Sequence, residues 1–152
     1  MSDYVVIGIG NILMSDDGVG VHAVRYLKDK LPGDVPLIEG GVYGLDLLPY
    51  LEGRDKAVFI DAVDAGDEPG AVFRFSPGDV AMREAAPSMS LHDLGLYELI
   101  AAAQLLDQCP GSIIIIAVQV KSLETGTELS QEVRDALPYV HRLVVEEIGG
   151  QG

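Results

Sequence analysis

Residues 4–11 read YVVIGIGN, and this segment decides the fold class of the chain. The first six residues form a short, almost continuous apolar run, which is typical of a strand covered on both faces. Two further runs of this kind occupy residues 57–61 and 112–118. Because parallel strands in the middle of a sheet have this composition, we expect all three runs to be central strands.

Segments with helical spacing of apolar residues alternate with these strands. The spacing predicts helices over residues 24–31, 96–106 and 133–148. Residues 35–38 are expected to form another strand, followed by a short helix near residues 44–51. Parallel strands need crossover connections, and helices commonly provide them, so the alternation favours a three-layer αβα arrangement.

Residues 71–75 differ from the central strands because Arg74 interrupts the apolar run and a turn-rich segment, residues 64–70, precedes it closely. We therefore expect an antiparallel edge strand here. Residues 76–90 carry prolines and mixed polar residues and should form a surface loop. The fold class predicted is α/β, a single domain over residues 1–152 with a mostly parallel, roughly five-stranded twisted sheet and one antiparallel edge strand.

Composition excludes several classes of function. The chain has 152 residues and carries 24 Asp plus Glu against 10 Lys plus Arg, a formal net charge of −14. This charge repels phosphate-rich surfaces, so we expect neither nucleic acid nor a membrane as partner. The N-terminus lacks the features of a secretory signal, and no apolar run is long enough to cross a bilayer. We expect a cytoplasmic protein.

Gly8 and Gly10 imitate the start of a dinucleotide-binding turn, since they follow a strand and precede a helix. However, Leu13 stands where the third glycine of that fingerprint would fall. Asp16 and Asp17 also stand at the helix entrance, where a pyrophosphate needs backbone amides and a positive dipole. The two carboxylates disfavour nucleotide binding.

The adjacent acids Asp16 and Asp17 are open to two interpretations. An aspartate at a helix start commonly caps the helix by accepting hydrogen bonds from unpaired amides. A helix needs only one capping residue, however, so capping alone does not explain two adjacent acids. Gly18 and Gly20 are expected to let this turn approach a neighbouring element closely.

Asp61 and His92 are the other candidate site residues. Asp61 ends a predicted central strand, at the sheet edge where open α/β sheets bind ligands, although it could simply form a turn. His92 lies near the start of a predicted helix with Ser90 as candidate N-cap, where the dipole favours the neutral imidazole that a metal needs. Alternatively, His92 is an ordinary surface histidine that binds no metal. We assign no chemistry to His22 or His141.

Two carboxylates and one imidazole would form a metal site of oxygen and nitrogen ligands. Nickel, zinc, iron and manganese are compatible with such a set. Three protein ligands leave coordination positions open for water or substrate, and a metal held in this way can polarise a carbonyl and activate water. The reaction class indicated is metal-assisted hydrolysis.

The sequence resembles a known family, the hydrogenase maturation endopeptidases, along nearly its whole length. Each matching block is weak alone, and together they are highly specific. The blocks are GIGNIL at residues 8–13, DDGVG at 16–20, EGG at 39–41, GLDLL at 44–48, DA at 61–62 and LHDLGL at 91–96.

The resemblance implies a nickel-dependent endopeptidase that removes the C-terminal extension of the immature [NiFe]-hydrogenase large subunit after nickel insertion. Asp17, Asp61 and His92 would hold the nickel, which would arrive with the precursor, and other divalent metals could occupy the same site. Many members carry Glu in place of Asp17, so Asp16 and Asp17 remain alternatives for the first-turn ligand. Glu39 stands outside the ligand set.

Two further expectations concern partners. A non-catalytic metal-binding module, acting as a nickel-checkpoint chaperone, could use the same ligands to dock the precursor. Partner specificity is expected in surface loops such as residues 76–90 and 121–129, because loops vary most freely on a rigid scaffold.

Overall fold

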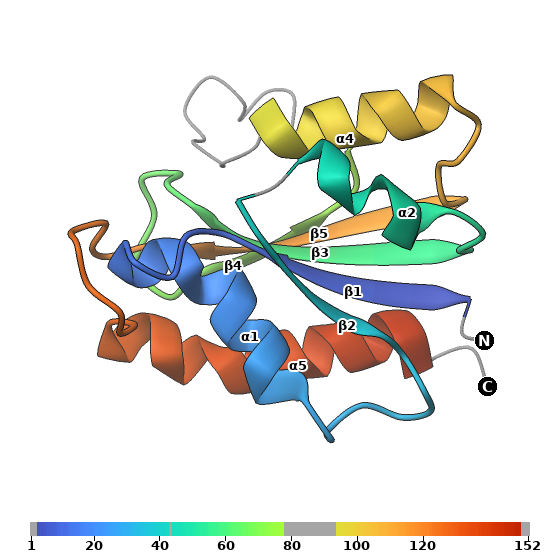
Figure 1. Ribbon diagram of the computed structural model, residues 1–152. Coiled ribbons are helices and arrows are strands. Elements are labelled where there is room, and N and C mark those ends of the chain that lie inside the picture. Colours follow the sequence, from blue (N-terminus) through green and yellow to red (C-terminus); the bar gives the residue numbers. More distant parts are fainter. Residues whose placement is uncertain (1–2, 43, 78–93, 150–152) are drawn as a thin grey trace.

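A computed structural model describes residues 3–42, 44–77 and 94–149 of the chain (Figure 1). Strands and helices alternate along most of this length. In chain order the elements are β1 (Tyr4–Ile9), the 3-10 helix η1 (Ser15–Gly18), α1 (Val19–Leu27), β2 (Leu37–Gly41), the 3-10 helix η2 (Leu45–Leu47), α2 (Leu48–Leu51), β3 (Lys56–Val63), β4 (Val72–Phe75), α4 (Leu94–Leu105), β5 (Ser112–Gln119) and α5 (Gln131–Gly149).

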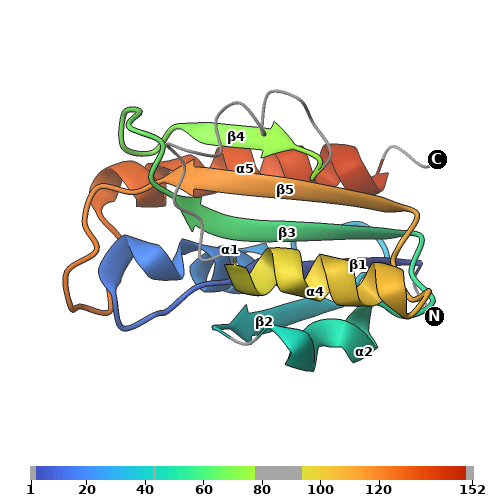
Figure 2. The same ribbon diagram turned by 90° about the horizontal axis from the view of Figure 1, so that it is seen from above.

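The strands form one sheet in the order β2-β1-β3-β5-β4, which can be followed in Figure 2. The pairs β1–β2, β1–β3 and β3–β5 are parallel, and β4 is antiparallel to β5 at the edge. The predicted fold class is therefore confirmed, including the antiparallel edge strand. None of the helices in the described part of the chain is long and apolar enough to cross a membrane.

Helices cover both faces of the sheet, with α1 and α5 on one side and α2 and α4 on the other (Figure 1). Successive side chains of a strand point to opposite faces, and β3 supplies both layers in this way. Val58 and Ile60 pack in the cluster with α1 and α5. Ala57 and Phe59 pack in the cluster with α4. Burial of both faces explains why the central strands are almost continuously apolar.

Several predicted boundaries were wrong by a few residues. The strand expected over residues 35–38 begins instead at Leu37, because Pro36 has no N–H for the ladder, although its carbonyl accepts from Val6 N at 3.0 Å. The helix expected to reach Leu31 ends at Leu27, since Lys28 is extended and Asp29 has a φ of 64°. Most of the loop predicted over residues 76–90 lies outside the described residues.

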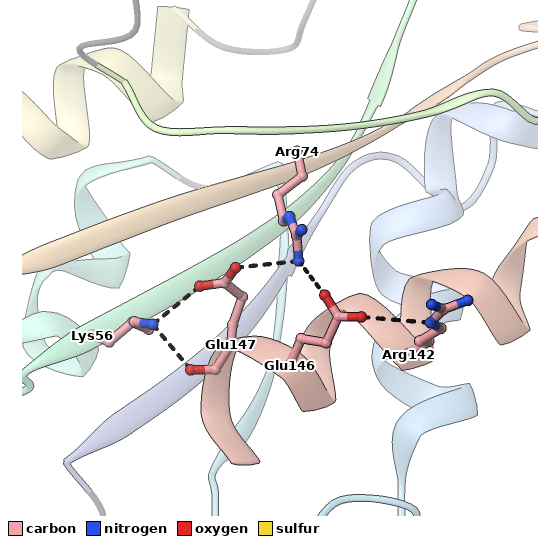
Figure 3. A network of polar contacts seen from close by, with 5 residues as sticks. All are labelled: Lys56, Arg74, Arg142, Glu146 and Glu147. Atoms are coloured by element: carbon pink, nitrogen blue, oxygen red, sulfur yellow. Dashed lines mark hydrogen bonds and ion pairs between the residues drawn. The ribbon is translucent and has the colours of Figure 1, made fainter. Parts of the chain in front are cut away.

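A network of charged side chains ties the last turns of α5 to the sheet (Figure 3). Lys56 Nζ donates to the carboxylate and to the main-chain carbonyl of Glu147, both at 3.0 Å. Arg74 Nη1 contacts Glu146 at 2.8 Å and Glu147 at 3.4 Å. Arg142 Nε adds a longer contact to Glu146 at 3.5 Å. Within this network Lys56 begins β3, five residues before Asp61.

Lys56→Met is expected to lower the free energy of unfolding by about 1 kcal/mol, because it leaves the half-buried carboxylate of Glu147 with a weaker set of partners. The methionine retains the apolar stem, so packing changes little. Urea denaturation followed by circular dichroism measures the difference. Arg142→Gln is the control, since its side chain is 73% exposed, and it should unfold like the wild type. Equal stability of both variants would contradict the assigned role of Lys56.

Candidate metal and active site

The candidate site lies at the sheet edge where β1 and β3 end. The chain leaves β1 at Ile9, passes through a short loop and enters η1, which carries Asp16 and Asp17 and contacts β3. Asp61 belongs to β3 itself, in the stretch that extends beyond the end of β1. The start of α1 and the carboxyl ends of these strands lie at the same end of the molecule in Figure 1.

Gly20 explains how closely the start of α1 approaches these strand ends. A Cβ atom at Gly20 would lie 2.2 Å from the carbonyl oxygen of Ile60 and 2.3 Å from that of Ile9. Only glycine allows this approach of backbone to backbone, which confirms the close contact expected for this residue. The first turn is therefore held directly against the residue that precedes Asp61.

Three aspartates are buried in this region. Asp16 and Asp61 are fully buried and Asp17 is 5% exposed, and they are the only charged side chains that are buried in the described part of the chain. Asp17 Oδ2 accepts a hydrogen bond from Asn11 N at 3.0 Å. Asp61 Oδ1 accepts from Ala62 N at 2.7 Å. Burying carboxylates costs free energy unless hydrogen bonds or cations compensate, so such a concentration indicates a specific role.

Asp16 has a structural role, because both of its carboxylate oxygens accept hydrogen bonds from another part of the chain. Its Oδ2 accepts from the backbone amides of Lys121 and Ser122, at 2.9 and 3.1 Å, and from the Ser130 hydroxyl at 2.8 Å. Its Oδ1 accepts from Ser130 N at 2.7 Å. Asp16 thus fastens the loop between β5 and α5 and lies at the positive end of α5.

The capping interpretation of the two acids was therefore wrong for their own helix. Neither η1 nor α1 has a side-chain cap, and Asp16 instead receives bonds at the start of α5, more than a hundred positions away. Sequence reasoning missed Ser130. Its signal was a serine directly before an apolar helical pattern, which is a common N-cap arrangement.

Asp16→Asn is expected to lower the free energy of unfolding by about 2 kcal/mol, because in either orientation the NH2 group of asparagine would face at least one backbone N–H that now donates to the carboxylate. Thermal denaturation of both proteins measures this loss. Ser130→Ala removes the hydroxyl donor alone and should cost about half as much. A loss no larger for Asp16→Asn than for Ser130→Ala would contradict the role of Asp16 as the central acceptor.

The loop after β5 is also joined to the first loop by backbone hydrogen bonds. Gly126 N donates to Leu13 O at 2.9 Å, and Ser15 N donates to Gly126 O at 2.8 Å. Ser15 Oγ donates to Glu124 O at 2.7 Å. Part of the loop expected to determine partner specificity, residues 121–129, therefore lies beside the candidate site.

A cleft of about 360 Å³ opens between the first loop and the end of β2. Its walls are mainly apolar and include Ile12, Leu13 and Val42. Glu39 lines it too, and its carboxylate accepts from Arg25 Nη2 at 2.9 Å, a hydrogen bond that lowers the pKa of Glu39. Glu39 is thus paired with an arginine.

The structure brings two of the three predicted site residues, Asp17 and Asp61, into elements that touch each other. His92 lies outside the described residues. Within residues 3–42, 44–77 and 94–149 there is no group of three or more His, Cys, Asp or Glu side chains arranged to hold a metal ion. The described part of the site therefore consists of carboxylates.

Comparison with known proteins identifies the family. A family model described as hydrogenase maturation protease matches residues 21–147. The chain belongs to the hydrogenase maturation protease family. Among its curated relatives, the hydrogenase expression/formation protein HupD of Bradyrhizobium diazoefficiens is 40% identical over 136 residues, covering 88% of this chain and 71% of the relative. The hydrogenase 2 maturation protease of Escherichia coli is 30% identical over 137 residues, covering 85% of this chain and 80% of the relative.

Solved structures support the same assignment. The hydrogenase-maturating endopeptidase HybD of Escherichia coli superimposes with a TM-score of 0.86 at 27% identity, covering 100% of this chain and 94% of that one. The [NiFe] hydrogenase maturation protease HybD of Thermococcus kodakarensis has a TM-score of 0.78 at 28% identity, covering 97% of this chain and 99% of the other. Membership of this family makes the chain a peptide hydrolase of hydrogenase maturation.

Proposed function

We propose that this protein is a nickel-dependent endopeptidase of the cytoplasm that removes the C-terminal extension of an immature [NiFe]-hydrogenase large subunit after nickel insertion. The observation that carries the proposal is the burial of Asp17 and Asp61 in contacting elements at the carboxyl edge of the sheet. A divalent cation shared by both carboxylates would compensate for the cost of their burial. Carboxylate oxygens also suit nickel and related divalent metals.

Asp17 is the better ligand candidate of the two first-turn acids. Both oxygens of Asp16 accept hydrogen bonds from the β5–α5 loop, and binding a metal would require that loop to release them. Asp17 Oδ2 accepts from Asn11 N, a hydrogen bond within the first loop that orients the carboxylate. We therefore assign the metal contact to Asp17 and the structural role to Asp16.

His92 is proposed as the third ligand. By the alternation of β3, Asp61 points to the same face of the sheet as Phe59, which is the face that α4 covers. The first turn of α4 lies at the same end of the molecule as the end of β3 (Figure 1). His92 precedes Leu94 by two residues, a span of at most about 7 Å. The packing of α4 on the face of β3 that carries Phe59 is the observation that supports a shared site with Asp61.

The chain's own groups would orient the substrate and the ion. Asp17, Asp61 and His92 hold the nickel that the precursor carries, and the apolar cleft beside the first loop accommodates the peptide flanking the bond to be cut. The bound metal supplies Lewis acidity, which polarises the peptide carbonyl and favours ionisation of a water molecule. Water is the nucleophile, and we assign no serine or cysteine to that role.

The decisive experiment compares nickel-loaded with nickel-free precursor, each incubated with the wild-type protein and followed by mass spectrometry. Trimming of the loaded precursor alone is the expected result. Trimming of both forms to the same extent would exclude the nickel requirement. His92→Ala tests the third ligand, since equal trimming by variant and wild type would exclude its role. An unchanged precursor mass with every protein would favour the nickel-checkpoint chaperone instead.

A further inference from the structure

A second cavity lies on the other side of the sheet from the α4 face, between α1, α5 and the segment 127–129. Its volume is about 440 Å³. Its walls combine polar and apolar groups: His22, Arg25, Tyr26, Leu129, Arg134 and Leu137, with Thr127 and Glu128 at the loop. The charged and aromatic residues come from two helices far apart in the sequence, so only the fold assembles this cavity.

The charge of these walls is opposite to that of the whole molecule. The chain has 10 Lys plus Arg against 24 Asp plus Glu, yet the cavity is lined by two arginines against one glutamate. Lys30 adds a further cation, because its Nζ lies 4.6 Å from the centre of the Tyr26 ring. A concentration of cations on an acidic protein attracts anions locally.

The imidazole ring of His22 also lines this cavity. Its Nε2 atom is buried, and no described residue accepts from it or donates to it. Burial lowers the pKa of His22, and the positive charges of Arg25 and Arg134, which line the same cavity, lower it further. Asp16 and the Thr127 backbone act in the opposite direction with smaller effect.

We propose that this cavity binds a small oxyanion, a carboxylate or a phosphate, between the side chains of Arg25, Arg134 and His22. Guanidinium groups bind both anions through paired charge-assisted hydrogen bonds. Arg134 is available for this role, since its described hydrogen bond is a long one, 3.4 Å from Nη2 to Leu129 O. The side chains of Leu129, Leu137 and Tyr26 also line the cavity, where they would contact an apolar group attached to the anion.

Two acidic groups oppose binding and limit its strength. Glu39 already pairs with Arg25 at 2.9 Å, and Glu128 lines the cavity at its loop side. An incoming anion must therefore share Arg25 with Glu39, which remains half exposed and can move aside. The expected affinity for a small inorganic anion is millimolar, at the weak end of specific binding. The site uses neither Asp17 nor Asp61, although Arg25 also lines the cleft that we assign to the peptide.

The test follows the ring protons of the three histidines by NMR while sodium phosphate or sodium acetate is added to the full-length protein. Sodium chloride at matched ionic strength is the control for screening. A bound anion stabilises the imidazolium, so the pKa of His22 should rise toward its ordinary value in a saturable manner. The signal of His141, whose Nε2 contacts Lys30 O at 2.9 Å, should change much less. His92→Ala and His141→Ala together assign the three signals.

Arg134→Gln should weaken the saturable response at least about tenfold, because a charge-assisted hydrogen bond contributes more than a neutral one. Arg142→Gln is the matched control, since it removes the same charge from an exposed position of the same helix and should leave binding unchanged. A response to phosphate alone identifies a phosphate site, and a response to acetate identifies a carboxylate site. Equal responses to phosphate, acetate and chloride, or equal binding by both variants, would overturn the proposal.

Discussion

Asp61→Asn is expected to reduce kcat/KM for precursor cleavage at least about 1,000-fold, which corresponds to a loss of about 4 kcal/mol of transition-state stabilisation. Asparagine has nearly the shape of aspartate, and its amide oxygen can still accept from Ala62 N. The change therefore removes the charge that would bind the metal while it retains the backbone contact. Cleavage is measured on nickel-loaded precursor, and folding is checked by circular dichroism.

Asp64→Asn is the matched control for this experiment. Asp64 follows the same strand, is exposed, and accepts from Gln119 Nε2 at 3.2 Å through an oxygen that asparagine also provides. It should cleave the precursor at the wild-type rate. Near-normal cleavage by Asp61→Asn, in a protein as well folded as the control, would remove Asp61 from the active site and with it the proposed metal centre.

Gly20→Ala is expected to lower the free energy of unfolding by at least about 4 kcal/mol, or to prevent folding altogether. The added methyl would lie 2.2 to 2.6 Å from backbone atoms of Ile60 and Ile9, which belong to the two strands that form the site. Alanine is the better helix former by about 1 kcal/mol, but that gain is smaller than the cost of separating a helix from a sheet. Chemical denaturation provides the measurement.

Gly111→Ala is the appropriate comparison, since its added Cβ would meet only Asp55 O, at an ordinary 3.5 Å. It should unfold within about 0.5 kcal/mol of the wild type. If Gly20→Ala were equally well tolerated, the close contact between α1 and the strand ends would not be a structural requirement, and the position of Asp17 relative to Asp61 would need another explanation.

The fold could be predicted from the sequence because its signals are local and repeated. Residues 4–9, 57–61 and 112–118 are almost continuously apolar, which reflects burial on both faces, and each of these runs lies within a strand that has a parallel neighbour. Arg74 interrupts the apolar pattern of β4 and correctly indicated that this strand lies at an edge of the sheet. Boundaries failed where a single backbone property decided them, as with the missing N–H of Pro36.

The sequence by itself determined the layer architecture, the sheet edge that carries the site and the identity of its candidate acids, because these follow from the spacing of residue types along one segment. Only the tertiary structure showed that these two adjacent acids have different hydrogen-bond partners. Asp16 binds Ser130, Lys121 and Ser122 from another part of the chain, and Asp17 binds Asn11 nearby. Hydrogen bonds between distant segments depend on how the folded loops contact each other. The local sequence pattern around Asp16 and Asp17 carries no information about those contacts.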